Sequence, residues 1–357
     1  AKWLNTVNST LWKYNIKYST FFQKLNFIKT SNYSTKYYSY INKLSKIPSE
    51  GFGKYTKLPL YVDLILKENK YGSICFVTPE LGRWSTVGGL GVMVDELTTC
   101  LAKLGQDVIV ITPYYHKNRK GVEGYLETDP AGFIFLNSFT VNIDRQYTFD
   151  VYHGKINEVK LYFIHNAEIF PEPYYEGDNE NKLRQIVLMG KASLELLCNQ
   201  KMIPSIIVTN DWYTGLTAGY GKGSHFGEAF KQTTFFHICH NLETAYQGRI
   251  YTNNTYNHIH QLDNNWLIDP YWKEKVINPS RCAILLSDQW GTVSKSYMED
   301  LLNQSQLSPI LRQHQKPFAY PNGIFKDKRI KIINDCFKGD REGAKEQIQI
   351  KFFHQKK

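Results

Sequence analysis

A glycine-rich turn between an apolar strand and an amphipathic helix limits the possible folds of this chain more than any other feature. Residues 74–77 before the turn are apolar, and residues 107–113 form a second apolar run further on. Between them, apolar residues recur at spacings of three and four over residues 88–104, which predicts a helix packed along one face. Strand, turn, helix and strand in this order predict a βαβ unit, and therefore a parallel sheet.

Further candidate elements extend this unit. Apolar runs predict more parallel strands at residues 161–165, 205–209, 233–238 and 291–294. Helical patterns cover residues 183–197 and 296–302, and residues 132–152 resemble an inserted β-meander. The alternation of strands and helices predicts an α/β fold with a doubly wound, Rossmann-like sheet.

We expect three parts in the chain. Residues 1–70 form a basic N-terminal extension, residues 71–325 form the Rossmann-like domain, and residues 326–357 form a basic tail with a helical pattern at 342–353.

The net charge is +10 and the pI is near 9.0. This excess of positive charge indicates an anionic partner such as RNA, an acidic protein surface or a membrane face. The alternative is compositional drift in a proteome rich in Lys, Asn and Tyr.

The first segment, residues 1–49, holds eight lysines and no acidic residue. Acid-poor, basic, hydroxyl-rich N-termini are typical of mitochondrial presequences, although those are usually rich in Arg. We expect a mature arm that lies on a partner in the mitochondrion. The alternatives are a helical extension packed on its own domain, and a cytoplasmic location.

Several site classes are not expected. The six cysteines are scattered and form no Cys-x-x-Cys pair, which favours buried free thiols in a reducing compartment. No apolar run reaches the length of a transmembrane helix. His237 and His240 have no matching carboxylate nearby in the sequence, so we expect no metal site, and we predict no cofactor.

The glycine-rich turn, residues 83–91, is the first candidate site. Glycine permits close approach of the backbone, and the N-terminus of the following helix offers free N–H groups, so the turn can hold a phosphate. The candidate residues are Thr86, Gly88, Gly89 and Gly91. The alternative is tight packing only, and the Gly-x-Gly-x-x-Gly fingerprint of dinucleotide-binding proteins is absent.

Six ordered motifs resemble those of glycogen and starch synthases, the glycosyltransferase family 5 enzymes. They are Thr86-Val87-Gly88-Gly89-Leu90, Asp107 to Tyr115, Gly177-Asp178-Asn179 with Arg184, Asn210-Asp211-Trp212-Tyr213-Thr214-Gly215-Leu216, His240-Asn241-Leu242 with Tyr246-Gln247-Gly248, and Thr292-Val293-Ser294 with Asn322-Gly323-Ile324. The wording around the glycines is also similar to the synthase domain of α-1,3-glucan synthases.

This resemblance implies the N-terminal half of a two-domain GT-B glycosyltransferase that transfers glucose with retention of configuration. In such enzymes this half carries the glucan acceptor surface, and the C-terminal half binds most of the ADP-glucose or UDP-glucose. A Lys and an Arg of the C-terminal half stabilise the phosphate charge. We expect that donor half to be absent from this chain.

The resemblance also assigns site residues. The family-equivalent polar positions are His240, Asp178 and Asp211, and the glucan-facing positions are Trp212, Tyr213, Asn241 and Tyr246. Simpler interpretations stay open: Asp211 caps the following helix, His240 is a satisfied core histidine, and Asp178 sits in a polar loop.

Four positions depart from the family pattern. Thr86 replaces a Lys, Tyr213 replaces a His, and Val92 and Phe325 replace Asp. A neutral hydroxyl holds a diphosphate less well than a cation does.

These departures favour a catalytically inactive, synthase-like domain that is a structural or interaction subunit of a large, mitochondrial complex. Its partners would be other subunits and RNA, through residues 1–49 and 326–357. The alternative is half of an active glucan synthase, with the donor domain on another chain. A third reading is a module that binds α-glucan or a nucleotide sugar without catalysis.

Overall fold

The computed structural model describes residues 72–175, 177–252, 254–269 and 275–304, together with 307, 310–311, 317–323, 325, 329–331, 334–335 and 340–353. The predictions made for the extension at residues 1–70 lie outside the described residues.

One nine-stranded sheet organises the domain, in the order β11-β10-β7-β6-β1-β2-β5-β4-β3. The strands from β11 to β5 along this order pair in parallel, and β4 and β3 are antiparallel additions beyond β5. The strand bounds are Ile74–Val77 for β1, Val108–Tyr114 for β2, Ile134–Asn142 for β3, Gln146–Ile156 for β4, Val159–His165 for β5, Ile206–Asn210 for β6, Thr234–Cys239 for β7, Gln289–Thr292 for β10 and Phe318–Ala319 for β11. A separate antiparallel pair joins β8 (Ile250–Tyr251) to β9 (Val276–Ile277).

The helices lie between consecutive strands, except α15, which follows β11. They are α5 (Gly82–Ser85), α6 (Gly89–Lys103), α7 (Asn179–Asn199), α8 (Thr217–Lys222), α9 (Asn257–His260), α10 (Asn264–Leu267), α11 (Pro279–Leu286), α12 (Lys295–Gln304) and α15 (Arg341–Phe353). Three short 3-10 turns are η2 (Trp212–Thr214), η3 (Ser224–Phe226) and η4 (Thr244–Tyr246).

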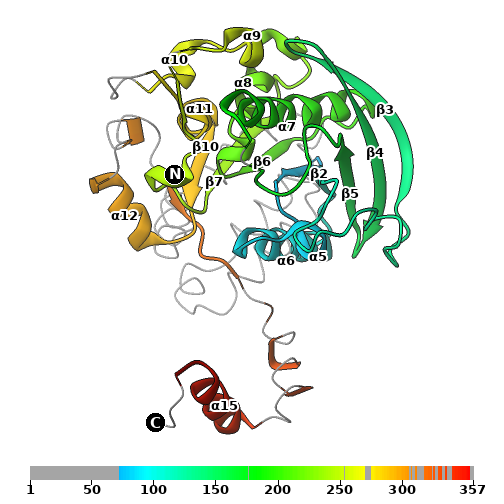
Figure 1. Ribbon diagram of the computed structural model, residues 1–357, viewed down its shortest axis with the longest axis vertical. Coiled ribbons are helices and arrows are strands. Elements are labelled where there is room, and N and C mark those ends of the chain that lie inside the picture. The colour runs from blue at the N-terminus through cyan, green and yellow to red at the C-terminus, as the bar shows by residue number, and fades with distance from the viewer. Residues whose placement is uncertain are drawn as a thin grey trace, which may run out of the picture. The chain divides into compact units, whose positions relative to one another are not determined.

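Helices cover both faces of the sheet, with α5 and α6 on one side and α7, α8 and α11 on the other (Figure 1). Side chains of β1 alternate between the two cores: Cys75 and Val77 pack with α7, whereas Phe76 packs with Leu90 and Val94 of α6. Burial on both faces is why these strands read as continuous apolar runs.

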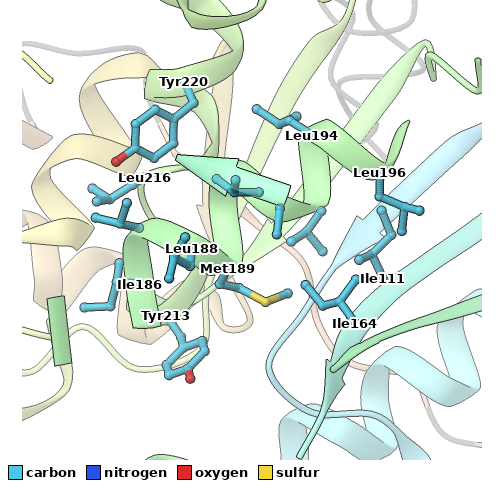
Figure 2. Packing of buried hydrophobic residues seen from close by; sticks show 14 of the residues in the cluster. Ile111, Ile164, Ile186, Leu188, Met189, Leu194, Leu196, Tyr213, Leu216 and Tyr220 are labelled. Carbon is cyan, nitrogen blue, oxygen red and sulfur yellow. The ribbon is translucent and has the colours of Figure 1, made fainter. Parts of the chain in front are cut away.

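Helix α7 contributes many residues to the larger of the two hydrophobic cores that flank the sheet. Its residues 183–194 are almost all buried, and Figure 2 shows Ile186, Leu188 and Met189 in the same cluster as buried residues of the strands and of the segment after β6. Among these partners are Ile111, Ile164, Tyr213, Leu216 and Tyr220.

The sequence predicted this architecture well. The α/β class, the mostly parallel sheet and the β-meander are confirmed, and the predicted helix over residues 88–104 is α6. The structure moves the start of the helix predicted at residue 183 back to Asn179, because the carboxylate of Asp178 accepts a bond from the amide of Asn181 and caps α7 there.

The strand order reverses at β1. From β1 the chain runs outward to β2, and later it returns on the opposite side with β6 and β7. In open α/β sheets, ligands bind beyond the carboxyl ends of the strands at such a reversal. The segments that follow β1, β6 and β7 are therefore the place to look for a site.

Candidate functional site

The segments that follow β1, β6 and β7 contain most of the predicted site residues. The glycine-rich turn follows β1, Asp211 and Trp212 follow β6, and His240 and Asn241 follow β7. Hydrogen bonds and ring contacts link these three segments, so the structure brings residues from distant parts of the sequence together.

A buried carboxylate, Glu80, organises the glycine-rich turn. Its Oε2 atom accepts bonds from the amides of Val87 at 2.8 Å, Gly88 at 2.9 Å and Gly91 at 3.3 Å. Its Oε1 atom accepts a bond from the Tyr174 hydroxyl at 2.7 Å, and the residue is only 3% exposed. We call these contacts the Glu80 clamp.

The Glu80 clamp changes the predicted use of the turn. The sequence predicts that amides at the start of the helix hold a phosphate, but the amides of Gly88 and Gly91 already bind the chain's own carboxylate. A buried carboxylate needs such donors, because an ion without hydrogen bonds is costly away from water. These amides are therefore not open to a ligand in this structure.

Thr86 is directed into the turn. Its hydroxyl donates a hydrogen bond to the carbonyl of Gly82. A Cβ atom added to Gly91 would lie 2.2 Å from Thr86 Oγ1 and 3.0 Å from Thr86 Cα. Internal packing thus requires glycine at position 91, as the packing interpretation predicts.

Gly88 and Gly89 behave differently. Both are exposed, and a Cβ atom added to either would meet no atom within 4 Å. Gly88 has an extended conformation with φ −130°, and Gly89 is the first residue of α6. Neither backbone strain nor contact within the described residues demands glycine there, so these two residues leave open space in front of the main chain.

An aromatic cluster joins the turn to β6. Tyr174, which bonds to Glu80, lies 5.9 Å from the Trp212 ring and 5.8 Å from the Tyr213 ring between centroids. The ammonium of Lys182 lies 5.2 Å from the centre of the Trp212 ring. Trp212 as a whole residue is partly exposed.

Asp211 has a strained backbone with φ +54°, where a non-glycine residue is uncommon. Its Oδ1 atom accepts a bond from the His240 amide at 2.7 Å, and the Asn241 amide is a second donor. The prediction that Asp211 caps the following helix is wrong, because its side chain makes no bond to η2 and bonds instead to the segment after β7. Burial raises the pKa of Asp211 to about 7.

His240 is partly buried and held by its neighbours. Its Nε2 atom lies 3.2 Å from Asn210 Oδ1, and burial lowers its pKa to about 4. His237 is fully buried, pairs through Nδ1 with Thr209 Oγ1 at 2.8 Å, and has its pKa lowered by burial to about 3. Both imidazoles are therefore neutral at physiological pH, and His240 can exchange hydrogen bonds with a neutral hydroxyl.

Asn241 and Tyr246 complete this side of the site. Asn241 Oδ1 accepts bonds from the Glu243 amide at 2.9 Å and the Tyr297 hydroxyl at 3.2 Å. Tyr246 is 53% exposed. We call Asn210, Asp211, His240, Asn241 and Tyr246 the β6–β7 end.

Two predicted site residues lie elsewhere. Asp178 is exposed, and within the described residues its carboxylate caps α7 rather than joining the β6–β7 end. Tyr213 is only 1% exposed, and its hydroxyl donates to Gln185 Oε1 at 3.2 Å. Its ring therefore belongs to the core and does not reach the surface.

Sequence reasoning missed Glu80 and Tyr174. The available signal for Glu80 was a single acid three residues after the end of an apolar strand, where burial is expected and a charge needs partners. For Tyr174 the local sequence held no comparable signal, because its partner is far away in the chain.

Some site classes find no support in the part of the chain that the structure describes. No group of three or more His, Cys, Asp or Glu side chains there could hold a metal ion. The helices among these residues are all too short or too polar to cross a bilayer.

Known proteins are similar to this chain over most of the described residues. The sequence of residues 73–313 matches the family described as the starch synthase catalytic domain. Glycogen synthase of Hydrogenobaculum sp. (strain Y04AAS1) is 30% identical over 261 residues, which are 70% of this chain and 50% of that protein. Glycogen synthase of Finegoldia magna is 30% identical over 266 residues, which are 70% of this chain and 52% of that protein.

A solved structure shares the fold. The catalytic domain of starch synthase IV from Arabidopsis thaliana, bound to ADP and acarbose, aligns with a TM-score of 0.62 and 24% identity over 73% of this chain and 53% of that one. The chain spans about half the length of the curated relatives it matches.

Proposed function

The chain belongs to the starch synthase catalytic domain family, and we propose that it is a synthase-derived domain that does not transfer glucose by itself. We propose that it acts as a structural or interaction subunit of a larger assembly. The observation that carries the proposal is the state of the glycine-rich turn. Position 86 offers a hydroxyl that is bonded inside the turn, and the amides of Gly88 and Gly91 bind Glu80.

A missing cation matters for this chemistry because charge develops on the departing diphosphate during glucosyl transfer. Donors aimed at that charge supply much of the rate enhancement. Removing one such donor typically reduces the rate by a factor of about 10²–10³. Burial of Tyr213 removes a second group from the acceptor surface.

A transfer assay tests the proposal. The purified chain is incubated with labelled ADP-glucose or UDP-glucose and a maltooligosaccharide primer, beside a full-length bacterial glycogen synthase as positive control. We expect no elongation of the primer by the chain alone, and none by the double variant Thr86→Lys, Tyr213→His. Elongation by either protein would refute the proposed inactivity.

We propose other protein subunits as the main partners, with RNA as a second class, and the mitochondrion as the compartment. The support is the charge of +10 and the absence of acidic residues from residues 1–49. In cell fractionation the native chain should be found with the mitochondria, and it should migrate in a particle much larger than its 41.6 kDa. A cytoplasmic chain or a free monomer would contradict this part.

The alternative function is half of an active glucan synthase that completes its site with a donor domain on another chain. The open space at Gly88 and Gly89 and the bonded Asp211–His240 pair favour it. Mixing the chain with a separately expressed C-terminal half of a bacterial glycogen synthase tests this alternative, which requires glucosyl transfer by the mixture alone.

In both cases we propose that an α-glucan lies against the β6–β7 end and Trp212. Maltoheptaose binding measured by calorimetry should weaken at least about fivefold in Tyr246→Ala, because stacking on an exposed ring contributes roughly 1 kcal/mol or more. Unchanged affinity would remove Tyr246 from the site.

A further inference from the structure

We propose that the outer edge of β3 is a docking surface for an extended, lysine- or arginine-bearing segment of a partner protein, which adds to the sheet as a further strand. This edge is on a different part of the sheet from the glycine-rich turn and the β6–β7 end. The inference therefore goes beyond the proposed function, because it names a surface and a partner chemistry that an interaction subunit needs.

Strand β3 is the last strand of the sheet in the part of the chain that the structure describes, and Figure 1 shows it at the outer edge, beyond β4. On one side it pairs antiparallel with β4, from Asn137 opposite Val151 to Asn142 opposite Gln146. An edge strand presents main-chain N–H and C=O groups on its other side, and another chain can pair with such a row. Residues 137–142 therefore offer a template for an added strand.

The sequence of β3 lacks the features that usually prevent pairing at an edge. Its nine residues include no Lys, Arg, Asp, Glu or Pro, whereas charged residues and Pro commonly protect edge strands. The register with β4 is irregular at Leu136, between Phe135 and Asn137. Such a bulge distorts the strand locally, so regular pairing with a partner is expected from Asn137 onward.

A groove of about 480 Å³ lies beside the same stretch of the edge. Residues 137–140 of β3 line it together with Glu195 and Asn199 of α7. Phe139 is only 8% exposed and packs into the core with α7, so the accessible lining is almost entirely polar. The groove leaves room for side chains of an added strand on the side of the sheet that α7 covers.

Two acceptor groups of this groove need a donor. The Oδ1 atom of Asn137 is buried and has no hydrogen-bond partner within the described residues. Glu195 is half-buried, and burial raises the pKa of its carboxyl because the charged form loses contact with water. The Asn199 side chain donates to this carboxyl, but Asn199 is neutral. A cationic donor from a partner would stabilise the charged form of Glu195.

The basic residue one helical turn before Glu195 is engaged elsewhere. The ammonium of Lys191 donates to Gln261 Oε1 at 2.6 Å and to the Asn142 carbonyl at 3.4 Å. It also lies 5.3 Å from the centre of the Tyr220 ring. Its attraction lowers the pKa of Glu195 less than burial raises it, so Lys191 does not compensate for the burial of this acid.

The charge of the groove distinguishes among possible occupants. A second copy of the chain would present its own β3, which has no basic side chain to meet Glu195. The carboxylate also repels RNA and an anionic membrane surface. An extended segment with a Lys or Arg on the face toward α7 fits best, because main-chain bonds along the edge supply affinity and the alternate side chains supply specificity.

Peptide titration of the full chain, followed by NMR amide hydrogen exchange, tests the inference. The probe is the end-blocked peptide Thr-Val-Thr-Lys-Thr-Val-Thr, in which the lysine and both valines share one face. Comparison peptides carry norleucine or glutamate in place of the lysine. We expect the lysine peptide to slow amide exchange in residues 137–142 and to bind at least about fivefold more tightly than the norleucine peptide.

A substitution in the groove tests the role of the acid. In Glu195→Gln the lysine and norleucine peptides should bind within about twofold of each other, because the charge is lost while the shape is kept. Glu228→Gln, at a side chain that is 79% exposed, is the matched control and should keep the preference for lysine. Loss of the preference in both variants would mean general attraction between charges and would overturn the inference.

Two further results would also overturn it. One is equal binding of the lysine and glutamate peptides, or unchanged exchange of residues 137–142 with every peptide. The other is a dimer of the chain in sedimentation that Ser138→Lys dissociates, because the occupant of the edge would then be a second copy. None of these results bears on glucosyl transfer, so the docking surface and the proposed inactivity are refuted separately.

Discussion

At the end of β1 the glycine-rich turn closes around the chain's own carboxylate, whereas at the ends of β6 and β7 polar side chains stay partly exposed. Glu80 is 3% exposed and its oxygens bind three amides and a hydroxyl. Asp211 and His240 are partly exposed as residues, although burial of their titrating groups shifts the pKa of each. In the first region the hydrogen-bonding groups of the turn bind to each other, whereas the second region still has partly exposed polar residues.

The difference teaches that a family motif can persist for two reasons. Gly91 is required by contact with Thr86, so this glycine is needed whether or not anything binds. Gly88 and Gly89 have no such internal requirement among the described residues. Variants at these positions separate structural from ligand-related roles.

The largest expected effect is the loss of the Glu80 clamp. Glu80→Ala removes the acceptor of three amides and of the Tyr174 hydroxyl, so we expect the free energy of unfolding to fall by about 3–5 kcal/mol. Urea denaturation measures it. Glu228→Ala, at a side chain that is 79% exposed, is the control and should change stability by less than about 0.5 kcal/mol. Equal effects would show that the turn does not depend on Glu80.

A second prediction concerns the pH dependence of the β6–β7 end. Burial lowers the pKa of His240 to about 4, below its unfolded value of about 6.5, so its contribution to stability is present above pH 6.5 and is lost as pH falls toward 4. In His240→Gln, the loss of stability between pH 7 and pH 5 should be smaller than in the native chain.

Two measurements check this prediction. Urea denaturation at both pH values gives the stability difference, and the NMR titration of the His240 ring gives its pKa directly. A native His240 that titrates near pH 6.5 would contradict the structure of the β6–β7 end.

The third prediction compares the stability of alanine variants at Gly91, which contacts Thr86, and at Gly89, which has open space around it. Gly91→Ala forces a Cβ atom against Thr86 and should cost about 1–3 kcal/mol of stability. Gly89→Ala should leave stability unchanged or raise it by up to about 1 kcal/mol, because alanine favours the helix. If Gly89 faces a ligand, Gly89→Ala weakens ADP binding although it does not lower stability. Unchanged ADP binding would show that Gly89 has no role in binding and is only the first residue of α6.

The smallest effect is expected at Tyr213. Tyr213→Phe removes a buried hydroxyl that bonds to Gln185 and Tyr115, and it should reduce stability by about 1 kcal/mol without changing maltoheptaose affinity. Tyr246→Ala should do the opposite, because its ring is exposed. A fall in glucan affinity in Tyr213→Phe would mean that the buried ring shapes the glucan surface after all.

The sequence by itself determined the α/β fold, the turn after β1 and the family. Apolar runs and helical spacing are local signals, and burial on both faces makes parallel strands easy to recognise. The ordered motifs added the family, which the match over residues 73–313 confirms.

Only the tertiary structure decided how the site residues are used. Glu80 meets Tyr174 across 94 positions and Asp211 meets His240 across 29, so neither contact leaves a trace in the local sequence. Burial likewise depends on distant packing: it placed Tyr213 in the core and Tyr246 on the surface, although both are tyrosines in family motifs. Hydrogen-bond partners and desolvation are properties of the folded arrangement, and they set which groups can meet a ligand.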